Sequence, residues 1–135
     1  MTACHHFALR VYYEDTDLAG IVYYANYLKF IERGRSEWVR ACGVDQVALK
    51  REAGAVFAVR RIEADYLRPA RFADDLVVTT RPIALQGARL VLQQQVLRGD
   101  VLLFAAVVTL VCLADSGAAR RLPAEIRRKL APDSP

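Results

Sequence analysis

The stretch NYLKFIERGRSEWVRAC, from Asn26 to Cys42, carries the pattern that sets the expected fold. Its apolar and small residues recur at steps of three and four, which is the spacing of one face of an α-helix. Gly34 costs about 1 kcal/mol against alanine inside a helix, so its presence indicates close backbone packing. We predict a long buried helix that ends before Gly43. The buried stripe is expected to consist of Tyr27, Ile31, Gly34, Trp38 and Cys42, widened by Leu28 and Phe30.

Segments with the pattern of β-strands lie on both sides of this helix. Phe7–Tyr13 alternates apolar and other residues, as in a strand that packs on one face. Short helices are expected over Asp45–Glu52 and over Pro123–Leu130, where proline suits the first turn. Four more strands, separated by turn residues that include a tight Gly99-Asp100 hairpin, are expected at Val56–Leu67, Leu76–Leu85, Leu90–Leu97 and Val101–Ala114.

One buried helix and five strands predict an α+β fold of two layers, in which an antiparallel sheet wraps the helix. No Gly/Ser/Pro-rich stretch or sustained charge run divides the sequence, so we expect one domain over residues 1–135. Val101–Ala114 is apolar on both faces of the expected strand. This predicts that one face or edge of the sheet packs against another subunit.

Composition argues against several classes of protein. The opening residues from Met1 to His6 do not resemble a secretory signal, so we expect a cytoplasmic location. The longest apolar run, Val101–Ala114, is shorter than the roughly 20 residues of a membrane helix, so no membrane insertion is expected. The net charge of +4 suits a small phosphorylated ligand, but the basic residues are scattered and no nucleic-acid partner is expected.

Histidine and cysteine are too few, and too unfavourably spaced, to predict a metal centre. His5 and His6 are adjacent, and adjacent side chains of an extended strand cannot both point at one ion. Cys4, Cys42 and Cys112 are an odd number at wide spacings, which predicts reduced thiols. We therefore expect no bound metal.

The most polar segment between two apolar elements is the loop Glu14–Gly20, which contains Asp15 and Asp17. It precedes the expected helix and so brings a carboxylate close to backbone N–H groups that have no partner within the helix. A carboxylate can attack a carbonyl or activate water, while such an N–H can stabilise the resulting oxyanion. Aspartates before helices more often cap the turn and the helix, and spacing alone favours that role.

The stretch VYYEDTDLAGIVYYANY, from Val11 to Tyr27, resembles the signature of the 4-hydroxybenzoyl-CoA thioesterase family. It is most similar to the Tol-Pal-associated acyl-CoA thioesterase branch, and the similarity is dense from Tyr12 to Arg40. The resemblance implies the hotdog fold, an antiparallel five-stranded sheet wrapped around a long central helix. It also implies an acyl-CoA thioester hydrolase that forms a homodimer or homotetramer with its site at a subunit boundary.

The resemblance assigns roles to single residues. Asp17 takes the position of the catalytic aspartate, as either nucleophile or general base. The backbone N–H of Tyr24 takes the position that polarises the thioester carbonyl, and Asp15 shapes the loop. The Tol-Pal-associated branch often has histidine where this chain has Tyr24, so only the backbone role transfers. Apart from the resemblance, the aromatic residues at and near the helix start could line an acyl pocket, although aromatics at helical spacing more often belong to the core. Of these, Tyr23 and Tyr24 are expected to lie near the site, with Tyr23 binding substrate.

Coenzyme A is part of the implied substrate, and no separate cofactor is expected. Its phosphates need cationic side chains. Arg89, which follows a turn at Gly87, is the first choice for this role. The next choices are arginines in other parts of the chain, namely Arg60, Arg61, Arg120 and Arg121.

Two alternatives stay open. A hotdog dehydratase acting on hydroxyacyl thioesters usually uses a histidine-containing site, whereas this chain has histidine only at His5 and His6. A non-catalytic acyl-thioester-binding or partner-docking protein would bind acyl-CoA without turnover. The sequence specifies neither the acyl group nor the pathway, because many substrates share this fold and loop.

Overall fold

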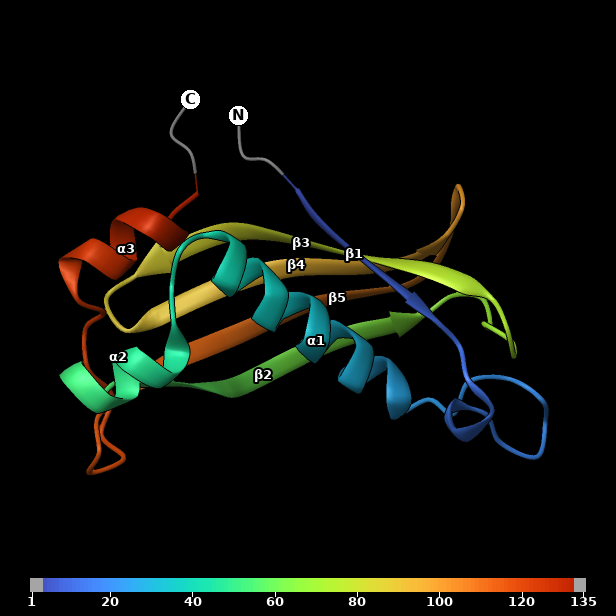
Figure 1. The fold of residues 1–135 in the computed structure, drawn as a ribbon, viewed down its shortest axis with the longest axis horizontal. Helices are drawn as coiled ribbons and strands as arrows, with labels where there is room; N and C mark the ends of the chain where they lie inside the picture. The colour runs from blue at the N-terminus through green and yellow to red at the C-terminus, as the bar shows by residue number, and fades with distance from the viewer. Residues whose placement is uncertain (1–3, 133–135) are drawn as a thin grey trace.

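A computed structural model describes residues 4–132 of the protein. In it, the segments with alternating apolar residues form an antiparallel sheet, and those with helical spacing form three α-helices. The last three strands end at turns that contain Gly or Asp, and the long amphipathic segment forms the longest helix (Figure 1). In chain order, the elements are β1 (His5–Arg10), a 3₁₀ turn (Tyr13–Asp15), α1 (Asn26–Ala41), α2 (Gln46–Ala53), β2 (Val56–Tyr66), β3 (Asp75–Gln86), β4 (Arg89–Arg98), β5 (Val101–Leu113) and α3 (Ala124–Leu130).

The strand order is β1-β3-β4-β5-β2, and every neighbouring pair is antiparallel. The predicted hairpin at Gly99-Asp100 joins β4 to β5, with Gly99 in the left-handed region at φ 57°. β1 and β2 are the two edge strands, although they come first among the strands along the chain. The helix α1 lies across one face of the sheet (Figure 1). This is the antiparallel five-stranded arrangement that the sequence predicts.

The core lies between α1 and the sheet. The helix buries one face against alternate residues of the strands, and Gly34 lies on this buried face. A Cβ at Gly34 would lie 2.5 Å from Cγ1 of the buried Val78, which confirms the predicted close packing. The sheet also contributes a buried polar side chain, Gln94, whose Nε2 donates to the Ile31 carbonyl at 2.8 Å and to Thr80 Oγ1 at 2.9 Å.

The strand β2 contains a bulge. Its register with β5 shifts between Val59 and Arg61, so the strand has one extra residue there. Phe57 packs against the core before the shift and Ile62 packs against it afterwards. The residues that face α1 therefore change from odd to even positions along the strand.

Two details of the prediction are wrong. The first strand ends at Arg10 instead of Tyr13, because the chain turns into the 3₁₀ segment and leaves Tyr13 82% exposed. Leu28 does not widen the buried stripe and is 38% exposed, since the sheet covers only one face of α1.

Within residues 4–132, none of the helices has the length and apolar character needed to span a membrane.

Candidate active site

The acidic loop folds as a small hairpin in front of α1. The Asp17 N–H donates to the Ile21 carbonyl at 3.0 Å, and the Gly20 N–H donates to the Asp17 carbonyl at 2.9 Å. Gly20 has φ 79°, which suits glycine at this turn. The Val22 N–H donates to the Ala70 carbonyl at 2.8 Å, which fastens the loop to the segment after β2. The loop is therefore exposed but has a defined backbone conformation.

The two aspartates of the loop have different environments. Asp15 Oδ2 accepts from the Tyr12 N–H at 2.8 Å, and the Asp15 carbonyl accepts from the Tyr23 N–H and from Asn26 Nδ2, each at 2.9 Å. Asp17 Oδ1 accepts only from the Ala19 N–H, at 2.9 Å, among residues 4–132. Neither carboxylate caps α1, whose N-cap residue is Ala25. Asp15 thus organises the loop, while Asp17 keeps an exposed carboxylate that serves no helix cap.

The backbone at the start of α1 presents an N–H without a protein acceptor. The Tyr23 carbonyl accepts from the Asn26 N–H at 2.8 Å, which orients the peptide that joins Tyr23 to Tyr24. Within the described part of the chain, the N–H of Tyr24 in this same peptide donates to no other residue. A fixed, unengaged N–H of this kind can stabilise negative charge on a carbonyl oxygen.

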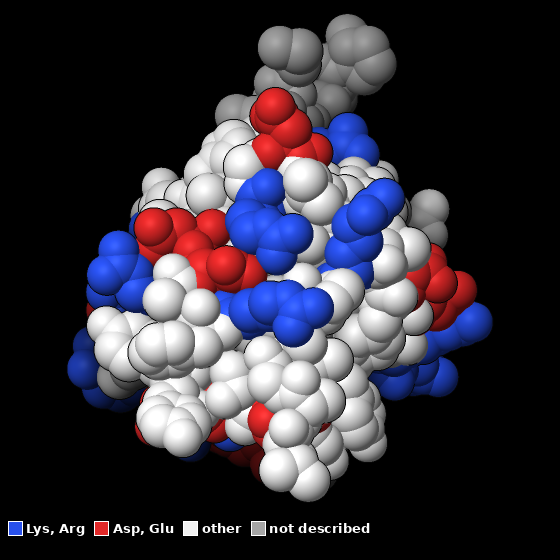
Figure 2. All heavy atoms as spheres, turned by 90° about the vertical axis from the view of Figure 1, so that its right-hand side faces the viewer, with Lys and Arg blue, Asp and Glu red and all other residues white. Residues whose placement is uncertain are grey.

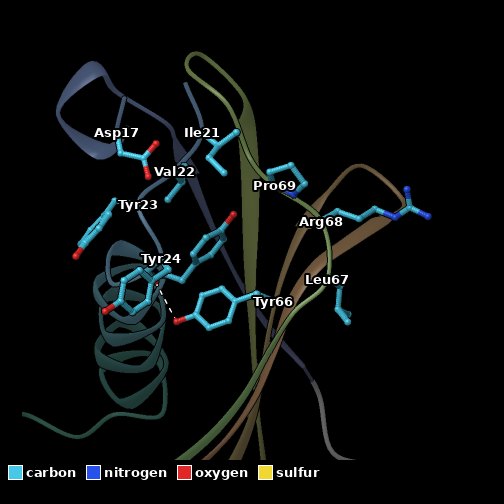
Figure 3. Close-up of a pocket in the computed structure, with 10 residues that line it drawn as sticks. Asp17, Ile21, Val22, Tyr23, Tyr24, Tyr66, Leu67, Arg68 and Pro69 are labelled. Atoms are coloured by element: carbon cyan, nitrogen blue, oxygen red, sulfur yellow. Dashed lines mark hydrogen bonds between the residues drawn. The ribbon is translucent and has the colours of Figure 1, made fainter. Parts of the chain in front are cut away.

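Asp17 and Tyr24 line one cavity, of about 350 Å³. Figure 3 shows Asp17 and Tyr23 on one side of it and Pro69 on the other, with the Arg68 side chain pointing outward. The wall from the end of β2 was not expected from the sequence, because this segment is far from the Asp17 loop along the chain. The residues that line the cavity are Asp17, Ile21, Val22, Tyr23, Tyr24, Tyr27, Tyr66, Leu67, Arg68 and Pro69.

Aromatic side chains give this cavity an apolar floor. Tyr27 stacks on Phe104 with ring centroids 5.0 Å apart, and its hydroxyl accepts from the Ala70 N–H at 3.0 Å. The Tyr66 hydroxyl donates to the Tyr24 carbonyl at 3.1 Å (Figure 3). The Tyr24 phenol and, to a smaller extent, the Asp17 charge raise the pKa of Tyr23, so this phenol stays protonated. An acyl group would therefore meet neutral aromatic surface beside a carboxylate.

Basic side chains flank the same end of the molecule. Arg68 lines the cavity, and Arg98 Nη1 donates to the Pro69 carbonyl at 3.3 Å and to Asp74 Oδ2 at 3.0 Å. Figure 2 views this end and shows several basic side chains, with acidic side chains next to them, beside an uncharged surface. The face thus combines positive charge with apolar area, which are the two properties that an acyl thioester of coenzyme A needs.

Of the residues selected from the sequence, Asp17, Tyr23 and Tyr24 share the cavity. Arg89 lies at the β3–β4 hairpin, opposite Gln86, at the other end of the sheet from the Asp17 loop (Figure 1). One chain alone therefore does not bring Arg89 to this cavity. Within residues 4–132, no three His, Cys, Asp or Glu side chains are grouped to hold a metal ion.

Comparison with known proteins shows the family of this chain. The model of the thioesterase superfamily matches residues 19–105. The chain belongs to the thioesterase superfamily. The acyl-CoA thioesterase YbgC of Haemophilus influenzae is 38% identical over 107 residues, which make up 79% of this chain and 79% of that protein. The resemblance found at Val11–Tyr27, including its acyl-CoA thioesterase branch, is confirmed.

Solved structures agree with this assignment. The crystal structure of a probable thioesterase from Bartonella henselae is 41% identical, with a TM-score of 0.85, and the match covers 90% of this chain and 100% of that one. A mutant 4-hydroxybenzoyl-CoA thioesterase in complex with 4-hydroxybenzoyl-CoA has a TM-score of 0.88 at 21% identity, over 95% of this chain and 99% of that one. The second match shows the shared fold, so the predicted hotdog architecture is confirmed.

Proposed function

We propose that this chain hydrolyses the thioester of an acyl-CoA to a free acid and coenzyme A, with Asp17 as the catalytic carboxylate. The observation that carries the proposal is that one apolar cavity is lined both by Asp17, whose carboxylate is exposed, and by Tyr24, whose N–H is unengaged among residues 4–132. Membership of the thioesterase superfamily and the acyl-CoA thioesterase activity named for the Haemophilus relative support the same reaction.

The chemistry follows from these two groups. The thioester oxygen accepts from the Tyr24 N–H, which stabilises the charge that develops on that oxygen. Asp17 then either attacks the carbonyl carbon, expelling the thiolate and leaving an anhydride that water cleaves, or removes a proton from an attacking water. Both routes need an ionised Asp17 close to the carbonyl, and both end in a carboxylic acid and a thiol. Neither route needs a metal or a separate cofactor.

A second copy of the chain completes this proposal. β2 is an edge strand of eleven residues whose outer side pairs with no other described strand. An exposed edge of this length favours pairing with another chain, and a two-fold pair would place the two β2 strands antiparallel. The end of the partner that carries Arg89 would then lie at the same end of the pair as Asp17. Arg89 would thus act across the subunit boundary, together with Arg68 of the first chain, on the phosphates of coenzyme A.

The proposed homodimer, or a homotetramer built from it, is tested by sedimentation of the purified chain. The half-exposed outer face of β5 offers an apolar surface on which two dimers could stack. A cytoplasmic location suits a substrate of this class and remains a prediction.

The hydrolysis is tested by measuring free-thiol release from a panel of short-chain, long-chain and aromatic acyl-CoAs, with the wild type and Asp17→Asn. The variant keeps an acceptor for the Ala19 N–H, so it should fold. We expect turnover by the wild type and a loss of about a hundredfold or more in the variant, because a general base contributes ~10²–10⁴-fold. Equal rates would remove Asp17 from the mechanism, and binding without turnover on any substrate would favour the non-catalytic alternative.

A further inference from the structure

A second cavity, of about 190 Å³, lies between α1 and the end of β2 that is farther from Asp17. The strand contributes Phe57 and Val59 to its wall, whereas Tyr66, at the other end of the strand, lines the cavity that contains Asp17. The helix contributes Glu32, Arg35 and other residues of its middle turns. The two cavities therefore lie along the same helix and the same strand.

A hydrogen bond to a buried side chain of the sheet holds Arg35 in place at this second cavity. Its Nη1 donates to Gln94 Oε1 at 3.0 Å. Gln94 is fully buried, and its own amide is held by the Ile31 carbonyl and by Thr80. The guanidinium is therefore placed by a buried network that uses one of its N–H groups, and its other donors have no hydrogen-bond acceptor among residues 4–132.

The charge of Arg35 is incompletely compensated. Among residues 4–132, no carboxylate lies within ion-pairing distance of it. Burial lowers the pKa of the guanidinium, and the charge of Glu32 opposes this effect. Glu32 shares the cavity wall, but it is exposed and its Oε2 accepts from Ser36 Oγ at 2.6 Å. A partly buried cation in this state is stabilised by an anionic ligand, and a carboxylate fits a guanidinium with two parallel hydrogen bonds.

The pairing of two β2 strands determines which molecule could supply this carboxylate. In an antiparallel pair, the Tyr66 end of one β2 lies beside the Phe57 end of the other. Both helices then lie on the same face of the combined sheet, because a two-fold axis perpendicular to the sheet relates them. The cavity that contains Asp17 in one chain would therefore face the Arg35 cavity of its partner.

We propose that Arg35 binds a carboxylate at the far end of the acyl group, so that the preferred substrates are acyl-CoAs derived from dicarboxylic acids. The inference rests on the hydrolysis and the β2 pairing proposed above. The apolar side chains Val39, Phe57 and Val59 enclose the methylene groups that lead to this carboxylate. The same site chemistry would accept a free carboxylic acid, and the experiment separates the two sources.

The test compares kcat/KM for three pairs of substrates that differ only in the terminal carboxylate: glutaryl-CoA with valeryl-CoA, adipyl-CoA with hexanoyl-CoA, and suberyl-CoA with octanoyl-CoA. We expect the wild type to prefer the carboxylated member of at least one pair by about tenfold to a hundredfold, the range of a hydrogen-bonded charge. Arg35→Met should bring this ratio close to one. Arg33→Met is the matched control, because Arg33 is exposed on the same helix, and it should keep the wild-type ratio.

The comparison of carboxylated with neutral substrates in the wild type tests the substrate preference even if Arg35→Met does not fold. Hydrolysis of neutral and carboxylated substrates at equal rates in all three pairs would overturn the inference and leave the proposed hydrolysis intact. No turnover of any of the six substrates, together with turnover of another acyl-CoA of the panel above, would also overturn the inference and leave the hydrolysis intact. No turnover of these six or of any acyl-CoA of the panel would instead overturn the hydrolysis. In that case, an NMR titration of the Arg35 Nε–H signal with glutaryl-CoA and with free glutarate tests whether Arg35 binds the terminal carboxylate. A shift with the thioester supports the acyl-tail site, whereas a shift with glutarate alone, or no shift, overturns it.

Discussion

The two halves of α1 are attached to the rest of the molecule by different kinds of contact. At its N-terminal end, hydrogen bonds from Asn26 join the helix to an exposed loop, and the two tyrosines just before the helix are accessible, with Tyr24 60% exposed. In its middle, Gly34 packs closely on Val78, and the fully buried Gln94 bonds to the helix backbone. The reacting groups thus lie where substrate can reach them, on a platform that close packing makes rigid. Changes in the middle should alter stability, and changes at the end should alter turnover.

The largest stability effect is expected for Gln94→Leu. It removes the bonds to the Ile31 carbonyl and Thr80 Oγ1 and leaves the Arg35 guanidinium without its partner. A buried charged donor without an acceptor is costly, so the free energy of unfolding should fall by about 2–3 kcal/mol. Urea denaturation measures this. Gln95→Leu, a change on the opposite face of the strand, is the control. An equal loss in this variant would show that the buried hydrogen bonds of Gln94 add no stability beyond that of any glutamine in the strand.

Gly34→Ala should have a smaller effect on stability. The new methyl group would lie 2.5 Å from Val78 Cγ1 and 3.0 Å from Val78 Cβ, and Val78 is fully buried. Overpacking costs about 1–3 kcal/mol, partly offset by the roughly 1 kcal/mol that alanine gains over glycine in a helix. We expect a net loss of about 1–2 kcal/mol by thermal or urea unfolding. A stabilised variant would mean that the helix can move away from the sheet at little cost, contrary to the rigid platform described above.

Asn26→Ala tests the other half of the comparison. It removes the bond of 2.9 Å from Asn26 Nδ2 to the Asp15 carbonyl and so loosens the loop that carries Asp17. One exposed or half-buried hydrogen bond contributes about 0.5–1.5 kcal/mol, so kcat should fall roughly twofold to tenfold. The free energy of unfolding should change by less than about 1 kcal/mol. Lys29→Ala, on the exposed side of the same helix, should change neither quantity, and an unaltered kcat in Asn26→Ala would argue against a positioning role.

The helix and the strands could be predicted from the sequence because each has a periodic pattern. The predicted helix over Asn26–Cys42 is observed as Asn26–Ala41, and the packing inferred from Gly34 is present. The order of the strands could not be predicted, because periodicity says which residues face the core and nothing about which strands are neighbours. The sequence therefore gave no sign that β1 pairs with β3 while β2 remains at the edge.

The candidate site was predicted in part for the same reason. The Asp17 loop and the start of α1 are adjacent along the chain, so local reasoning brought Asp17, Tyr23 and Tyr24 together. The opposite wall, which includes Tyr66, comes from a distant segment that only the fold brings near. The polar cavity around Arg35 was also missed, since it depends on the buried Gln94 of a distant strand.

The bulge in β2 has a consequence for the two cavities on this strand. Side chains of a regular strand alternate between its two faces, so residues an odd number of positions apart face opposite ways. Val59 and Tyr66 are such a pair, yet both line cavities on the helix side, because the extra residue shifts the phase of the strand between them. Deleting Arg60 would restore regular alternation and turn one end of the strand away from α1. One extra residue in the strand thus keeps the cavity that contains Asp17 and the cavity that contains Arg35 on the same face of β2. A substrate that spans the two cavities of a pair of chains depends on this arrangement.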